Sequence, residues 1–121
     1  MHTEHGHLVS TSARGLRITL TNTAGELLRV SVAGEVDLAT SGELRAALDA
    51  VLADLSDTPV EVDLTDVPFL DSSGVHVLLD AHALAAARGC PLVVAHVRPV
   101  VRRVLEITGV LALLGLSPAG R

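Results

Sequence analysis

The stretch VEVDLTDVPFLDSSGVHV, residues 60–77, says most about the fold of this chain. In its first half, apolar and acidic side chains alternate and so fall on opposite faces of an extended strand: Val60, Val62 and Leu64 against Glu61 and Asp63. This alternation is typical of a strand with one buried face. An Asp-Ser-Ser-Gly block then leads into apolar residues at helical spacing. The stretch therefore predicts a strand, a short loop and a helix in succession.

The regions on both sides continue this pattern. The same alternation predicts two upstream strands joined by a hairpin, at about 16–20 and 28–32. Helical spacing predicts three helices, at about 40–52, 72–86 and 99–108. Thr40 and Glu43 form a capping box at the start of the first helix. A short apolar run predicts another strand at 92–95, and Val110–Leu114 favours one last edge strand.

These elements predict an α/β fold with a single domain. Strand–helix–strand crossovers form a parallel portion and the initial hairpin an antiparallel one, so the sheet is mixed, with roughly four to five strands. Charged residues inside the strands, such as Arg29 and Glu61, indicate that the helices cover mainly one face of the sheet. We expect a flexible leader at 1–14, the domain at 15–116 and a short tail at 117–121.

The composition restricts the class of function. The net charge is −5, and the chain has one Phe and neither Trp nor Tyr, so it lacks the basic surface and the stacking platforms of a nucleic-acid-binding protein. Cys90 is the only cysteine, which excludes an internal disulfide and fits a reducing compartment. The first residues lack signal-peptide features, and no apolar run is long enough to cross a membrane. We therefore expect a soluble, cytoplasmic protein with no direct contact to nucleic acid or membrane.

The Asp71-Ser72-Ser73-Gly74 block lies where the second predicted helix begins. Unpaired backbone N–H groups and the helix dipole favour negative charge there, so the helix end itself would receive a phosphate on a serine. Gly74 would leave the first turn open to a partner's backbone. The alternative is structural: Asp71 or Ser72 is simply the N-cap, which stabilises a helix by about 1 kcal/mol. The block alone leaves both interpretations open.

A family resemblance favours the regulatory interpretation. From about Leu16 to Leu114, the chain resembles the STAS-domain anti-sigma factor antagonists. Four blocks in register carry the resemblance: Gly34-Glu35-Val36-Asp37 leading into Thr40, Asp63-Leu64, Phe69 to Gly74, and Arg98 to Leu105 followed by Thr108-Gly109-Val110.

The resemblance implies a partner switch with no enzymatic activity and no cofactor. In the family, an anti-sigma factor that is also a serine kinase holds a sigma factor inactive. The unphosphorylated antagonist binds this kinase and releases the sigma factor. Phosphorylation by the kinase ends the interaction, and a metal-dependent phosphatase restores it. The family's phosphorylated serine matches Ser72, although sequence alone does not exclude its neighbour Ser73.

From the resemblance and from the position of Gly74 and His76 at the start of the helix, we expect a set of partner-binding residues: Asp37, Thr40, Asp71, Ser72, Ser73, Gly74 and His76. Thr40 and Asp37 each have a structural alternative. For Thr40 we favour a helix cap over partner contact. For Asp37, partner contact and the fixing of a turn are equal alternatives.

Three other functions fit parts of the sequence. A serine hydrolase with Ser72 as nucleophile would need a base such as His76 or His96, and the G-x-S-x-G elbow is absent. A receiver domain phosphorylated at Asp63 or Asp66 would need a late lysine, and the chain contains none. A STAS scaffold or binding module in a stress-signalling complex, whose serine is never phosphorylated, remains open. The histidines are not spaced to predict a metal site.

Overall fold

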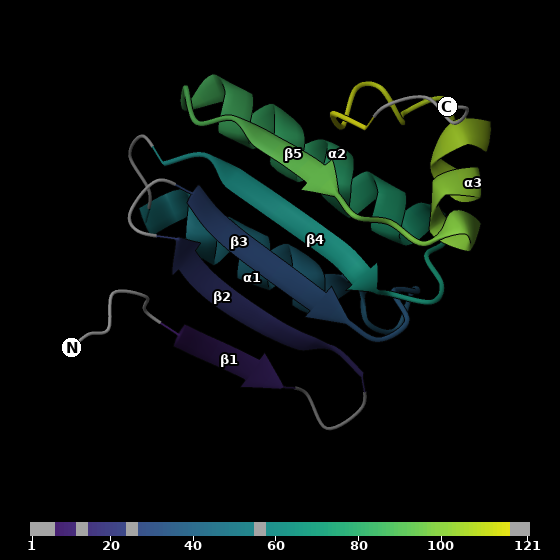
Figure 1. Cartoon of the computed structure of the whole chain (residues 1–121), viewed down its shortest axis with the longest axis horizontal. Helices are drawn as coiled ribbons and strands as arrows, with labels where there is room; N and C mark the ends of the chain where they lie inside the picture. The colour runs from purple at the N-terminus through teal and green to yellow at the C-terminus, as the bar shows by residue number, and fades with distance from the viewer. Residues whose placement is uncertain (1–6, 12–14, 24–26, 55–57, 117–121) are drawn as a thin grey trace.

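The computed structural model describes residues 7–11, 15–23, 27–54 and 58–116, which form one mixed α/β unit (Figure 1). The elements follow one another as β1 (His7–Thr11), β2 (Arg17–Thr23), β3 (Leu27–Ala33), α1 (Ser41–Asp54), β4 (Val60–Asp66), α2 (Ser72–Ala87), β5 (Leu92–Ala95) and α3 (Pro99–Ile107). Among the described residues, every helix is too short or too polar to span a lipid bilayer.

The strands form a single sheet in the order β1-β2-β3-β4-β5. The first three strands pair antiparallel, while β3, β4 and β5 pair parallel. Helices α1 and α2 lie side by side behind the sheet, and α3 lies at the end where the parallel strands point (Figure 1). The prediction of a mixed sheet with helices mainly on one face is confirmed. All three helices begin at the edge formed by the carboxyl ends of β3, β4 and β5, which we call the carboxyl edge.

The hydrophobic core lies between the sheet and the two helices behind it. Because side chains alternate along a strand, one set of residues in β3 and β4 points toward the helices, and most of this set is buried: Val30, Val32, Val60, Val62 and Leu64. The helices bury one apolar stripe each, which includes Leu44, Leu48 and Leu52 of α1 and Val75 and Leu78 of α2. Each such side chain stabilises the fold by about 1.5–3 kcal/mol.

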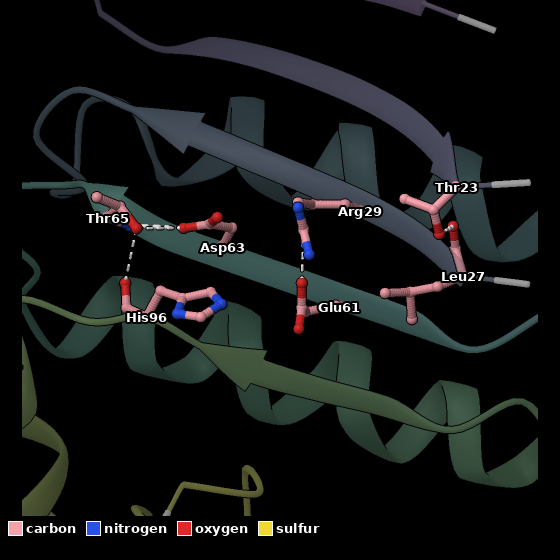
Figure 2. Close-up of polar contacts among 7 residues, drawn as sticks. All are labelled: Thr23, Leu27, Arg29, Glu61, Asp63, Thr65 and His96. Atoms are coloured by element: carbon pink, nitrogen blue, oxygen red, sulfur yellow. Dashed lines mark hydrogen bonds and ion pairs between the residues drawn. The ribbon is translucent and has the colours of Figure 1, made fainter. Parts of the chain in front are cut away.

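The opposite face of the sheet carries polar and charged side chains. Figure 2 shows Arg29 of β3 beside Glu61 of β4, with 2.6 Å between Nε and Oε1. These two residues are register partners in the parallel pair. The charged residues inside the strands therefore lie on the face that the helices leave uncovered, as the alternation predicts.

The predicted flexible leader is wrong over residues 7–11, which form the edge strand β1. Backbone pairing with β2 makes this strand, from the pair His7 and Thr21 to the pair Thr11 and Arg17. Five residues with one apolar pair, Leu8 and Val9, carry too little periodicity to reveal it. The rest of the expected leader, residues 1–6 and 12–14, and the expected tail at 117–121 lie outside the described residues.

The predicted last strand at Val110–Leu114 is also wrong, because this segment forms turns. Its backbone bonds are local and helix-like, such as Leu114 N–H to the Val110 carbonyl at 3.1 Å. Leu111 and Leu114, three residues apart, both point into the core. One contact with the sheet remains, since Val94 N–H donates to the Leu114 carbonyl at 2.8 Å. The fifth strand of the sheet is therefore β1, at the other edge.

Candidate functional site

Two loops meet at the carboxyl edge. The first, which we call the aspartate loop, is residues 34–40 between β3 and α1; the second, the serine loop, is residues 67–74, which connect β4 to the first turn of α2. Val36 N–H donates to the Phe69 carbonyl at 2.9 Å, and Asp71 N–H donates to the Val36 carbonyl at 3.1 Å. Val36 and Leu70 are both buried at this bridge. The loops therefore form one hydrogen-bonded unit.

Gly74 allows the first turn of α2 to pack onto this unit. A Cβ atom on Gly74 would lie 2.8 Å from Val36 Cγ1 and 2.9 Å from Leu70 Cγ, closer than real Cβ contacts allow. Gly74 is buried. The expectation that Gly74 opens the turn to a partner's backbone is therefore wrong, because the missing side chain makes room for neighbours inside the protein.

Asp71 is the N-cap of α2. Its backbone is extended, with φ −107° and ψ −171°, and its Oδ1 accepts hydrogen bonds from Ser73 N–H at 2.9 Å and Gly74 N–H at 3.3 Å. The Ser73 hydroxyl donates to the same oxygen at 2.5 Å. This hydroxyl and the two amide groups lower the pKa of the Asp71 carboxyl from its ordinary value of 3.8, although partial burial opposes them. Of the two cap residues that the sequence allowed, the structure selects Asp71.

Ser72 and Ser73 differ in what their hydroxyl groups do. Ser72 is the first residue of α2 and is exposed, and its hydroxyl makes no hydrogen bond with any residue that the structure describes. Ser73 is half-buried and its hydroxyl is bound to Asp71. The exposed serine of the pair is therefore also the one with a free hydroxyl, a distinction that residue type alone did not provide.

Asp37 and Thr40 organise the aspartate loop from within. Asp37 Oδ1 accepts from Ala39 N–H at 3.0 Å and Thr40 N–H at 3.1 Å, so Asp37 fixes a turn. Thr40 is only 5% exposed, and its hydroxyl donates to the Glu35 carbonyl at 2.8 Å. This geometry supports the turn interpretation for Asp37.

The predicted capping box at the start of α1 is wrong. The Thr40 hydroxyl accepts from Asp37 N–H at 3.0 Å, within the loop, rather than from an amide in the first turn of the helix. The Glu43 carboxylate accepts from Leu16 N–H at 3.4 Å, a residue 27 positions away. Both side chains of the expected box therefore have partners outside it, and Thr40 is too buried for the alternative role of partner contact.

Besides Ser72, three exposed side chains lie at this site: Phe69 on the serine loop, Leu38 on the aspartate loop and His76 on α2. Leu38 is 82% exposed and Phe69 is 43% exposed, although both are large and apolar. His76 is exposed one helical turn after Ser72, so the two share a face of α2. We call Leu38, Phe69, Ser72 and His76 together the candidate surface. Sequence reasoning missed the two apolar members; the signal was an apolar residue in each loop that belongs to neither a strand nor a helix pattern.

The arrangements needed by the rival chemistries are absent from the described part of the chain. Neither the Ser72 hydroxyl nor the His76 ring has a hydrogen bond there, and His96 follows β5, beside Thr65 (Figure 2). The Asp63 carboxylate accepts from the Thr65 hydroxyl at 2.6 Å (Figure 2). No group of three or more metal-ligating side chains occurs among these residues. The geometry within the described ranges thus offers neither a serine–histidine pair nor a metal centre.

Comparison with known proteins gives matches over most of the chain. A family profile described as "Mlab, STAS domain" matches residues 18–115. The anti-sigma F factor antagonist of Paenibacillus polymyxa is 29% identical over 99 residues, which cover 82% of this chain and 84% of that protein.

Solved structures with a similar fold include an anti-sigma factor antagonist from Mycobacterium paratuberculosis, with 29% identity, a TM-score of 0.65, and coverage of 96% of this chain and 87% of that one. The anti-sigma factor antagonist SpoIIAA in its unphosphorylated form has 18% identity and a TM-score of 0.65, with coverage of 94% and 90%. The phosphorylated form of SpoIIAA from Bacillus has 18% identity and a TM-score of 0.59, with coverage of 94% and 93%. The two SpoIIAA matches concern the fold alone. The STAS family profile covers nearly all of the described residues from β2 onward, and the chain therefore belongs to the STAS domain family.

Proposed function

We propose that this protein is an anti-sigma factor antagonist. It binds an anti-sigma factor that is a serine kinase, and this binding releases the sigma factor which the kinase otherwise holds inactive. Phosphorylation of Ser72 by the kinase ends the binding, and a metal-dependent phosphatase reverses it. The two relatives at 29% identity, both described as anti-sigma factor antagonists, support this proposal.

The observation that carries the proposal is the difference between the two serines. A kinase must bring the acceptor oxygen in line with the transferred phosphoryl group, so the acceptor hydroxyl has to be reachable and free to lose its proton. Ser72 meets both conditions, because it is exposed and its hydroxyl makes no hydrogen bond within the described residues. Ser73 would first have to leave Asp71, and α2 would lose a contact of its N-cap. Ser72 is therefore the acceptor that we propose.

The candidate surface suits a protein partner. Leu38 and Phe69 expose apolar area on the two loops that backbone hydrogen bonds hold together, and the second of these loops leads into Ser72. Aromatic side chains such as Phe69 are enriched at protein interfaces relative to the rest of the protein surface. This geometry favours a binding protein over an enzyme, since Leu38 and Phe69 supply contact area and the His76 ring makes no hydrogen bond to Ser72.

A phosphate on Ser72 would change this surface by charge. It adds about −1.5 to −2 at neutral pH, next to the Asp71 carboxylate. At the centre of an interface, such a charge would lose its water without gaining a compensating partner. Full reversal of occupancy needs about 5.5 kcal/mol of differential affinity, and partial inhibition needs less.

The test is capture of partners from extract of the source cells with purified protein in four forms. Wild type, Ser72→Ala, Ser72→Asp and, as a matched control, Ser73→Asp are compared by mass spectrometry of the bound proteins. We expect wild type and Ser72→Ala to retain an ATP-binding serine kinase and Ser72→Asp to lose it. Incubation of the captured kinase with ATP should phosphorylate wild type and not Ser72→Ala. If all forms retain the same proteins, or if none retains a kinase, the protein is a binding module without this switch.

A further inference from the structure

The N-terminus of α2 already holds a negative charge of its own. The Asp71 carboxylate accepts from the N–H groups of Ser73 and Gly74, at 2.9 and 3.3 Å. In a free helix end, these are the groups that would bind a phosphate. The sequence led us to expect that the helix end would receive a phosphate on Ser72. The structure contradicts that expectation for these two N–H groups, because Asp71 occupies both.

We propose that Asp71 keeps a phosphate on Ser72 away from the N-terminus of α2, so that the phosphate stays exposed and is repelled by the neighbouring carboxylate. Asp71 is a positioning residue in this role, since it acts by holding the amide groups and by its charge. The inference rests on the proposed phosphorylation of Ser72 and describes how the protein presents the phosphate to its partner.

Several contacts keep Asp71 in its place when a phosphate arrives. Its N–H donates to the Val36 carbonyl at 3.1 Å, and its carbonyl accepts from Val75 N–H at 3.1 Å. The Ser73 hydroxyl holds its carboxylate at 2.5 Å. A phosphate that displaced the carboxylate would have to break three side-chain hydrogen bonds at once while the backbone stays fixed. Since the pKa of Asp71 is lowered from 3.8, the carboxylate is ionised throughout the second ionisation of the phosphate, which occurs at about pH 6.

The surrounding helix offers the phosphate little compensation. In the first two turns of α2, residues 72–79, His76 is the only side chain that can become a cation. Arg45 of α1 reaches α2 one turn later and is paired with Asp80 at 2.9 Å. The phosphate therefore remains an exposed anion at the candidate surface, where it acts on a partner directly and without a change in the fold.

The experiment uses the full chain with phosphoserine installed at position 72 during translation, and it requires no partner. The second ionisation of the phosphate is followed by ³¹P NMR. A bound phosphate would have a pKa below its ordinary value of about 6, whereas a repelled one has a pKa above it. A unit negative charge roughly 6 Å away in water raises the pKa by about 0.5.

Asp71→Asn is the informative variant, because asparagine is an equally good N-cap and lacks the charge. We expect this variant to lower the pKa of the phosphate by about 0.5. Asp54→Asn is the matched control: Asp54 ends α1 at the opposite edge of the sheet from Ser72, so its replacement should leave the pKa of the phosphate unchanged. A pKa below about 6 in the wild-type phosphoprotein, or no response to Asp71→Asn, would overturn the inference.

A second measurement needs no variant. The ¹H–¹⁵N signals of Ser73 and Gly74 should move little through the titration of the phosphate, because Asp71 continues to bind both amides. Large downfield shifts that follow the phosphate would mean that the helix end has received it, which contradicts the inference. Either result leaves the partner-capture experiment to decide the proposed function, so the two can fail separately.

Discussion

Replacing Gly74 with alanine tests how tightly the first turn of α2 packs against the two loops. The added Cβ would lie 2.8 Å from Val36 Cγ1 and 2.9 Å from Leu70 Cγ, and both atoms belong to buried side chains on the bridge between the loops. Because both side chains are buried, the added atom requires these side chains, the loops or α2 to shift. Overpacking of this kind costs about 1–3 kcal/mol.

Helix propensity opposes this loss. Alanine favours a helix over glycine by up to about 1 kcal/mol, so the net effect should be a loss of about 0.5–2 kcal/mol in the free energy of unfolding. For a chain of this length, that loss corresponds to a decrease in Tm of roughly 2–8 °C. The control is Gly42→Ala in α1, where an added Cβ meets no atom within 4 Å. Gly42→Ala should therefore raise the stability by up to about 1 kcal/mol.

Urea unfolding followed by far-ultraviolet circular dichroism measures both variants, since the chain has neither Trp nor Tyr for a fluorescence assay. We expect opposite signs for the two changes in midpoint. If Gly74→Ala stabilises the protein as Gly42→Ala does, then Gly74 does not pack against Val36 and Leu70 as described. The account of the joined loops would then fail.

Three further predictions concern the site. Asp71→Ala should destabilise the protein by about 1 kcal/mol through loss of the N-cap, while Ser72→Ala should change the stability by less than about 0.5 kcal/mol, as urea unfolding will check. Because the folded-state pKa of Asp71 is lowered, its ionised form stabilises the fold above the unfolded value near 3.8, and this stability is lost as pH falls through the folded value. The stability difference between wild type and Asp71→Asn should therefore shrink in melts below about pH 4, and a difference that grows there would contradict the assignment. Leu38→Ser should weaken binding of the captured kinase by about fivefold or more with unchanged Tm. Ile107→Ser, at an exposed apolar residue of α3, should leave binding unchanged in calorimetric titration.

The elements with regular periodicity were predictable from the sequence. Strand β4 and helix α2 follow directly from the change of spacing within residues 60–77, because one buried face imposes a period on each. Strand β1 was not predictable in this way, since backbone pairing with β2 creates it and side-chain pattern contributes little. The prediction of a strand at Val110–Leu114 failed for a related reason. A short apolar run does not distinguish a strand from turns that bury every third residue.

The candidate site was predictable in its position and less so in its contacts. The sequence placed Asp71 and Ser72 at a helix start, which the structure confirms. It did not distinguish the free hydroxyl of Ser72 from the bound hydroxyl of Ser73, because that depends on side-chain geometry. The Glu43 carboxylate binds the backbone N–H of Leu16 and does not form the expected capping box. No local motif can reveal this partner, because it is distant in sequence.

The central claim is that phosphorylation of Ser72 controls binding to a kinase. The most direct test is the affinity of that kinase, isolated by the capture experiment, for unmodified protein and for protein with phosphoserine at position 72, measured by isothermal titration calorimetry. Protein with phosphoserine at position 73 is the control. We predict that phosphoserine at position 72 weakens binding by about a hundredfold or more, equivalent to about 2.8 kcal/mol. Equal affinities for the unmodified protein and the protein with phosphoserine at position 72 would contradict the claim.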